Sequence, residues 1–132
     1  MTRCLLNVFL IFALAGLGAS AIAADKAPID IAYYPIKPSI VSNLTGGPKY
    51  IRCDVQLMTE RASEIPNLAH HEPALRHTLL MLIASQDGGA LNTPSGKERL
   101  RTAALDAIQT QLEKLTGSRI VDDLYFTAYY VK

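Results

Sequence analysis

The pattern of apolar and polar residues predicts β-strands in three parts of the chain, and in the clearest of them the two kinds of residue alternate with a period of two. The clearest alternation runs from Tyr50 to Thr59, where the inward-facing residues are Ile51, Cys53, Val55 and Leu57. Residues 29–44 are also extended in character, but Pro35 and Pro38 each lack a backbone N–H donor. We therefore expect residues 29–44 to form a broken or edge strand, joined as a hairpin to the strand at 50–59.

The last part of the chain, residues 119–132, alternates as well, but both of its faces are apolar or aromatic. One face is expected to carry Leu124, Phe126, Ala128 and Tyr130, and the other Tyr125, Thr127, Tyr129 and Val131. This pattern predicts a central strand, or a strand whose outer face contacts something else.

Between these strands, apolar residues recur at helical spacing in two segments. Pro73 fits the first turn of a helix that runs to about Gln86, where residues 87–89 stop it. Thr93 is expected to cap a second helix, which ends at Gly117. The apolar positions are Leu75, Leu79, Leu82 and Ile83 in the first helix, and Leu100, Ala104, Ile108, Leu112 and Leu115 in the second.

The start of the chain is a leader, because the run from Cys4 to Ala24 carries no charge and follows Arg3. Such a leader directs export, either as a signal peptide cleaved after Ala21 or Ala23, or as a retained membrane anchor. Both possibilities stay open. We expect residues 1–24 to be this leader and residues 25–132 to be one exported α+β domain of order β-β-α-α-β, with two helices over one face of a small sheet.

Composition excludes several classes of function. The net charge is +1, with 13 basic and 12 acidic residues and no tryptophan, so the chain lacks the basic stripe of a nucleic-acid-binding protein. Cys53 is the only cysteine after the leader, which rules out a disulfide within the exported domain. Its place in the alternation predicts a small core residue. So small a domain buries a modest core, and this favours a homo-oligomer.

No catalytic constellation emerges from the motifs. The chain has no phosphate-binding glycine loop, no pair of closely spaced cysteines and no metal-binding helix motif. The histidines, His70, His71 and His77, have no ligand partner at suitable spacing, and Glu72 is expected to pair with Arg76. Asp122 and Asp123 point to opposite faces of a strand, so we expect them to begin the strand. We assign no catalytic, cofactor-binding or metal-binding residue.

Five segments of the chain form a set through their order and spacing. They read YYPIKPSIVSNL (33–44), KYIRCDVQL (49–57), PALRHTLLMLIAS (73–85), GKERLR (96–101) and VDDLYFT (121–127). The first two are strands, and the most specific two are Gly96 to Arg101 and Val121 to Thr127. Together the five segments resemble the FliL family of flagellar basal-body-associated proteins. His77 departs from the family pattern, which often has an acid at this position.

The resemblance implies a non-enzymatic protein of the inner membrane whose periplasmic domain has a stomatin-like (SPFH-type) fold. Family members are thought to assemble as oligomers around the stator units of the flagellar motor and to support rotation, swarming and chemotaxis. The alternative is a secreted or anchored periplasmic binding module with another envelope partner, free in the periplasm if the leader is cleaved. Aromatic residues are enriched at interfaces, so the candidate contact residues are Tyr33, Tyr34, Tyr125 and Tyr129.

Overall fold

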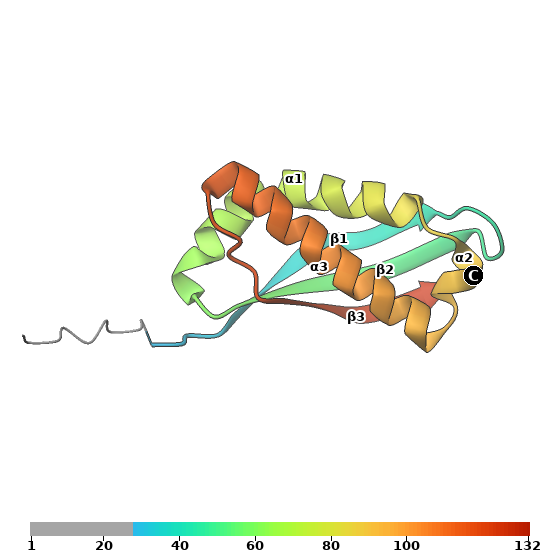
Figure 1. Cartoon of the computed structure of the whole chain (residues 1–132), viewed down its shortest axis with the longest axis horizontal. Helices are drawn as coiled ribbons and strands as arrows, with labels where there is room; N and C mark the ends of the chain where they lie inside the picture. Colours follow the sequence, from blue (N-terminus) through green and yellow to red (C-terminus); the bar gives the residue numbers. More distant parts are fainter. Residues whose placement is uncertain (1–27) are drawn as a thin grey trace, which may run out of the picture.

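A computed structural model describes residues 28–132, in which two long helices cover one face of a three-stranded antiparallel sheet (Figure 1). This arrangement confirms the predicted α+β class and the predicted order of the strands and long helices. The leader expected at residues 1–24 lies outside the described residues. Within residues 28–132, no helix combines the length and the hydropathy that crossing a membrane requires.

The sheet has the order β1-β2-β3, with strands β1 (Ala32–Asn43), β2 (Tyr50–Thr59) and β3 (Asp123–Val131). The bounds of β2 and the edge position of β1 are as predicted. The prediction of a central last strand is wrong, because β3 pairs with β2 alone and forms the second edge. Apolar or aromatic residues occur on both faces of β3, but only one face packs on the core, and the helices leave the other face uncovered.

Each edge strand contains one irregularity. In β1 the pairing jumps from Ile36 to Ile40, so three residues of β1 lie opposite Asp54 of β2. In β3 the pairing jumps from Phe126 to Ala128, which leaves Thr127 as an extra residue. The single extra residue of β3 moves every later side chain to the opposite face, whereas the two extra residues of β1 leave Ile36 and Ile40 on the same, buried face.

The irregularity in β3 overturns the predicted faces after residue 127. Tyr129 and Val131 join Phe126 against the core, whereas Tyr130 is on the exposed side with 54% of its surface accessible. A simple period of two had placed Tyr130 with Phe126. The alternation alone gives no sign of the irregularity.

Helix α1 (Ile65–Ala84) begins eight residues before the predicted start at Pro73, after a short 3₁₀ turn, η1 (Ala62–Glu64). Pro66 has the position in the first turn that the sequence suggested for Pro73, and Pro73 lies inside the helix. An internal proline loses one backbone hydrogen bond and bends a helix. In Figure 1 the first turns of α1 run at an angle to the rest. Leu68, which is fully buried, holds these first turns on the core.

Helix α3 (Pro94–Thr116) has the bounds that its capping residues predict. The Thr93 hydroxyl accepts a hydrogen bond of 3.0 Å from the backbone N–H of Gly96, and Gly117 ends the helix in the left-handed conformation, with a φ of 79°. The helical stripe is buried except for Leu115, which is 41% exposed because it lies in the last turn. The short helix α2 (Gly88–Leu91), which precedes α3, was not predicted.

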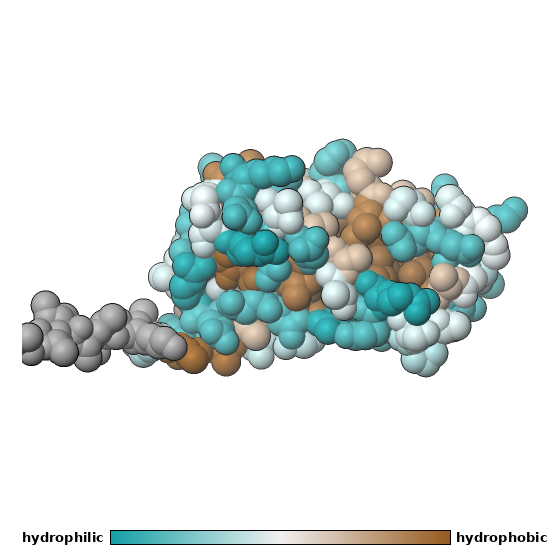
Figure 2. Space-filling model, in the orientation of Figure 1, coloured by the Kyte–Doolittle hydropathy of each residue, from teal (hydrophilic) through white to brown (hydrophobic). Residues whose placement is uncertain are grey.

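The core fills the layer between the sheet and the two long helices. Its central members are completely buried and come from every layer, for example Leu57, Leu79, Ile108 and Leu124. Cys53 is also fully buried, which confirms its predicted place in the core. Figure 2 views the helical side, where polar side chains cover much of the surface and apolar surface appears in the strip between α1 and α3.

Candidate functional site

The most distinctive surface of the domain is the face of the sheet that the helices leave uncovered, which we call the outer face. It carries the residues of each strand that point away from the helices, and several of them are large and apolar or aromatic. Tyr33 and Tyr130 are each 54% exposed, and Val41 is 48% exposed. The remaining two of this kind, Tyr50 and Tyr125, are 37% and 38% exposed. Apolar exposure of this kind is typical of a surface that binds another molecule.

The structure separates the four predicted contact residues into two pairs. Tyr33 and Tyr125 lie on the outer face, where their ring centres are 6.5 Å apart across β2. Hydrogen bonding to Asp123 raises the pKa of Tyr125. These two residues therefore have the exposure that a contact residue needs.

Tyr34 and Tyr129 are on the other side of the sheet and are partly buried under the helices. The Tyr34 hydroxyl donates a hydrogen bond to Glu72, and this bond, with burial, raises the pKa of Tyr34 to about 12. The Tyr129 hydroxyl donates to the backbone carbonyl of Leu91 at 2.9 Å, and burial raises the pKa of Tyr129. Both hydroxyls are thus occupied within the domain.

Sequence reasoning missed Tyr130, Tyr50 and Val41 as exposed residues of the outer face. Tyr50 precedes the buried Ile51 in β2, so the alternation contained the signal for its orientation. Tyr130 gave no such signal, because the extra residue in β3 reverses its orientation. Val41 has the same orientation as Tyr33, because the irregularity in β1 adds two residues, so the position of Val41 next to the buried Ile40 was a usable signal.

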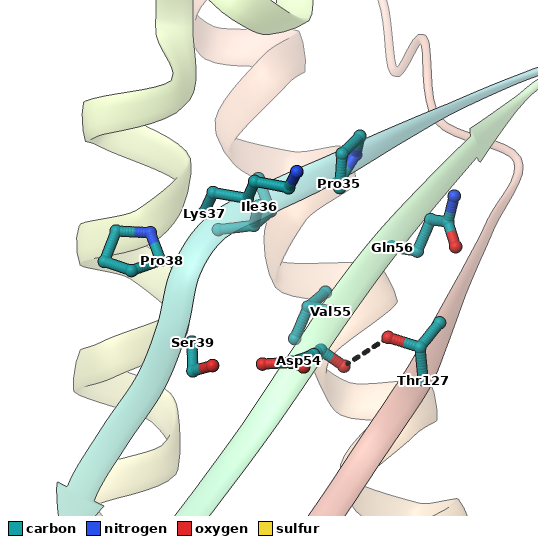
Figure 3. Close-up of a pocket in the computed structure, with 9 residues that line it drawn as sticks. All are labelled: Pro35, Ile36, Lys37, Pro38, Ser39, Asp54, Val55, Gln56 and Thr127. Atoms are coloured by element: carbon teal, nitrogen blue, oxygen red, sulfur yellow. Dashed lines mark hydrogen bonds between the residues drawn. The ribbon is translucent and has the colours of Figure 1, made fainter.

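A hollow of about 540 Å³ opens in the sheet where β1 separates from β2 (Figure 3). It is lined by Pro35, Pro38 and Ser39 on one side and by Asp54 and Thr127 on the other, among others. In Figure 3 the Asp54 side chain points from β2 toward Ser39. The Thr127 hydroxyl donates to the Asp54 backbone carbonyl at 3.5 Å, which ties the extra residue of β3 to the same place.

Helix α1 holds the irregular part of β1 through two charged side chains. Glu72 accepts a hydrogen bond from the backbone N–H of Lys37 at 3.1 Å, in addition to the one from Tyr34. Arg76 donates to the backbone carbonyls of Pro38 and Ser39. The predicted pairing of Glu72 with Arg76 is therefore wrong, because each side chain bonds to β1 instead. Spacing within a helix could not reveal these partners on a distant strand.

The two most specific motif segments meet in space through Arg101 of α3. Its guanidinium donates to Asp123 at 2.6 Å, at the start of β3, and also to Glu98 one turn away. It further donates to the backbone carbonyl of Leu124 at 3.3 Å. The neighbouring Asp122 accepts from the backbone N–H of Glu60 at 2.7 Å. Both aspartates thus fix the start of β3, as the sequence predicted.

The histidines and the cysteine of the described part of the chain lie apart from the outer face. Within residues 28–132, no three side chains of the metal-binding types come together. His70 and His71 contact each other edge to face on α1, with ring centres 4.8 Å apart. Burial raises the pKa of the Cys53 thiol to about 12, so this thiol is not a nucleophile at neutral pH.

Two comparisons with known proteins show which family the chain is similar to. The family model described as "Flagellar basal body-associated protein FliL" matches residues 33–131. A curated relative, the "Flagellar protein FliL" of Aquifex aeolicus (strain VF5), is 26% identical over 101 residues. That match covers 75% of the chain and 60% of the relative, so the chain spans about 60% of the relative's length. Both matches confirm the family resemblance drawn from the sequence.

Proposed function

The chain belongs to the FliL family of flagellar basal body-associated proteins, and we propose that it supports the stator units of the flagellar motor as a non-enzymatic accessory protein. The observation that carries this proposal is the extent of the family match, which takes in almost the whole sheet and all the helices. The motif segments within the match build the frame of the domain, as the contact between Arg101 and Asp123 illustrates. We therefore assign the motif segments a structural role, which is to stabilise the fold of the domain.

The proposed place of action is the periplasmic side of the inner membrane, at the flagellar basal body. The uncharged run from Cys4 to Ala24 supports this, because such a run directs export or anchors a protein in the membrane. A retained leader holds the domain at the membrane directly. A cleaved leader leaves the domain free in the periplasm, held at the motor by protein contacts alone.

The outer face of the sheet is the surface that we assign to contacts with other copies and with motor proteins. Tyr33 and Tyr125 lie together on it, and both are exposed. Aromatic side chains offer large contact areas at a small entropic cost, which is why interfaces are rich in them. Tyr34 and Tyr129 contribute to this contact indirectly, by fixing the strands from the helical side.

The test is a deletion strain of the source bacterium, complemented with the full-length chain. We expect swimming to be weakened and swarming under high load to be weakened more, because load demands more engaged stator units. Complementation with Tyr33→Asp is expected to fail, whereas Met81→Asp, at a 57% exposed site on the helical side, is expected to succeed. Immunoblots confirm that the variants accumulate equally.

Normal swimming and swarming of the deletion strain under low and high load would overturn the motor role. In that case affinity purification of the tagged full-length chain identifies its partner. Recovery of an envelope protein unrelated to the motor supports the alternative, a periplasmic binding module of the same fold. Recovery of stator or basal-body proteins excludes that alternative.

A further inference from the structure

We propose that two copies of this chain pair through the outer faces of their sheets, around a two-fold axis that crosses β2 at the level of Cys53. This inference concerns the domain itself and stands whether or not the chain acts on the stator. It follows from a self-complementary arrangement of shape and charge on the outer face.

One row of this face is a ridge, which we define as Val41, Arg52 and Tyr130. These residues are direct neighbours across the three strands, since Val41 pairs with Arg52 and Arg52 pairs with Tyr130. All three have long or bulky side chains and are exposed, Val41 to 48% and Tyr130 to 54%.

The next row of the same face is a depression. Asp54 lies two residues along β2 from Arg52, and its neighbour on β3 is the small residue Ala128. On the other side, β1 has no partner for Asp54 because its pairing jumps from Ile36 to Ile40, and the hollow of Figure 3 opens there. The ridge and the depression therefore lie side by side, about 7 Å apart.

The two-fold axis lies in the plane between the two sheets, perpendicular to the strands and midway between the two rows. Rotation about this axis places each ridge in the depression of the other copy. The strands of the two copies then run antiparallel, and each strand faces its own counterpart. Tyr130 of one copy lies over the small Ala128 of its partner, and Val41 lies over the hollow beside Ser39. Two sheets packed face to face in this way lie about 10 Å apart.

The charges of the two rows are complementary in the same geometry. Arg52 and Asp54 form no ion pair with any other side chain in residues 28–132. The two-fold axis places Arg52 of each copy against Asp54 of the other, which makes two equivalent ion pairs. An isologous interface requires such self-complementarity, because the same patch is used twice.

The ends of β2 favour the antiparallel arrangement as well. Lys49 and Lys132 lie at the end where β2 begins, and they are joined by a backbone hydrogen bond of 3.1 Å. Glu60 and Asp122 lie at the opposite end, where they are also hydrogen-bonded. Antiparallel stacking brings the basic end of one copy near the acidic end of the other, whereas parallel stacking opposes like charges.

The size of the face limits the strength of this pairing. Three strands of about nine residues, spaced about 4.8 Å apart, present a face of roughly 15 by 30 Å. This is smaller than the roughly 800 Å² that each partner contributes to a standard interface. We therefore expect a reversible dimer and not a permanent one.

The test mixes full-length chains with two different affinity tags in the same mild detergent, fixes associated chains with a brief lysine cross-link, and measures how much of one chain is retained with the other. Arg52→Asp and Asp54→Arg are each expected to lower co-retention at least fivefold, because each places like charges at the centre of the contact. A mixture of the two single variants is expected to regain at least half of the wild-type value. In that mixed pair every central contact again joins opposite charges.

The double variant Arg52→Asp/Asp54→Arg is expected to self-associate like the wild type, since the exchange restores both ion pairs. Met81→Asp on α1 is the matched control and leaves co-retention unchanged. Any association through the leader is equal in all variants and cannot produce this pattern. Wild-type co-retention of the single variants, or failure of both the mixture and the double variant to recover, would overturn the two-fold pairing.

Discussion

Tyr34 illustrates how a single side chain depends on an element far away in the sequence. Its hydroxyl donates to Glu72, which is 38 residues further along the chain, and its pKa rises from 10 to about 12. A sequence pattern places Tyr34 in a strand but gives no indication of this partner. In contrast, the burial of Cys53 follows directly from the alternation in β2, because both of its neighbours in the pattern face the same core.

The raised pKa of Tyr34 leads to a spectroscopic prediction. The folded protein holds the phenol proton more tightly than the unfolded chain does, so this group stabilises the fold fully below pH 10. That contribution is lost as the pH rises from 10 to about 12. Absorbance at the tyrosinate band, recorded against pH, should show a late ionisation near pH 12 among the six tyrosines. The variant Tyr34→Phe should lack this step, and Tyr50→Phe should retain it. A late step that survives in Tyr34→Phe contradicts the assignment.

At the scale of elements, the accuracy of prediction depended on whether the deciding interaction is local. Helix α3 was predicted at both ends because Thr93 and Gly117 carry capping signals in the sequence itself. The start of α1 was missed because the burial of Leu68 keeps Pro73 inside a helix that its local preference opposes. The face of Tyr130 was missed because an extra residue in β3 follows from the pairing with β2.

Gly96 tests the packing of α2 against α3. A Cβ at this position would lie 1.7 Å from the backbone carbonyl oxygen of Ala90, a clash that backbone movement alone can relieve. Alanine favours a helix over glycine by about 1 kcal/mol, whereas overpacking costs about 1–3 kcal/mol. The two terms together leave a net loss, and we expect Gly96→Ala to lower the free energy of unfolding by about 1–2 kcal/mol in urea denaturation. The exposed neighbour supplies the control, because Ser95→Ala should change it by less than about 0.5 kcal/mol. Unchanged stability of Gly96→Ala would show that α2 is not held in this position.

The contact between α3 and β3 is tested by a double-mutant cycle on Arg101 and Asp123. Their side chains are 28% and 30% exposed, so water screens the pair only in part. We expect a coupling free energy of about 1 kcal/mol between Arg101→Met and Asp123→Asn, measured by urea denaturation. The control cycle combines Arg99→Met, at an exposed position of the same helix, with Asp123→Asn, and its coupling free energy should be near zero. Equal coupling in the two cycles would remove the special role of Arg101.

At the scale of the whole molecule, the domain is a two-layer structure that lacks a cover on one side. The sequence predicted that two helices cover one face of the sheet. The apolar and aromatic residues on both faces of the last strand also indicated that its outer face could be available for contact with another molecule. The arrangement of ridge and depression was beyond prediction, since it arises where irregularities in β1 and β3 meet at Asp54. A surface of this kind depends on the register of all three strands together.

The outer face connects the proposed pairing with the proposed role at the flagellar basal body, and a cellular experiment tests both together. If paired copies are the active form, Arg52→Asp and Asp54→Arg should each reduce swarming of the complemented deletion strain, and the double variant should restore it. Restoration is the informative result, because a face that binds a different protein gains nothing from exchanging its own two charges. Met81→Asp should swarm normally, and immunoblots should show equal amounts of every variant. If the double variant swarms as poorly as the single variants while it still forms dimers in detergent, the face contacts a motor component and not a second copy during rotation.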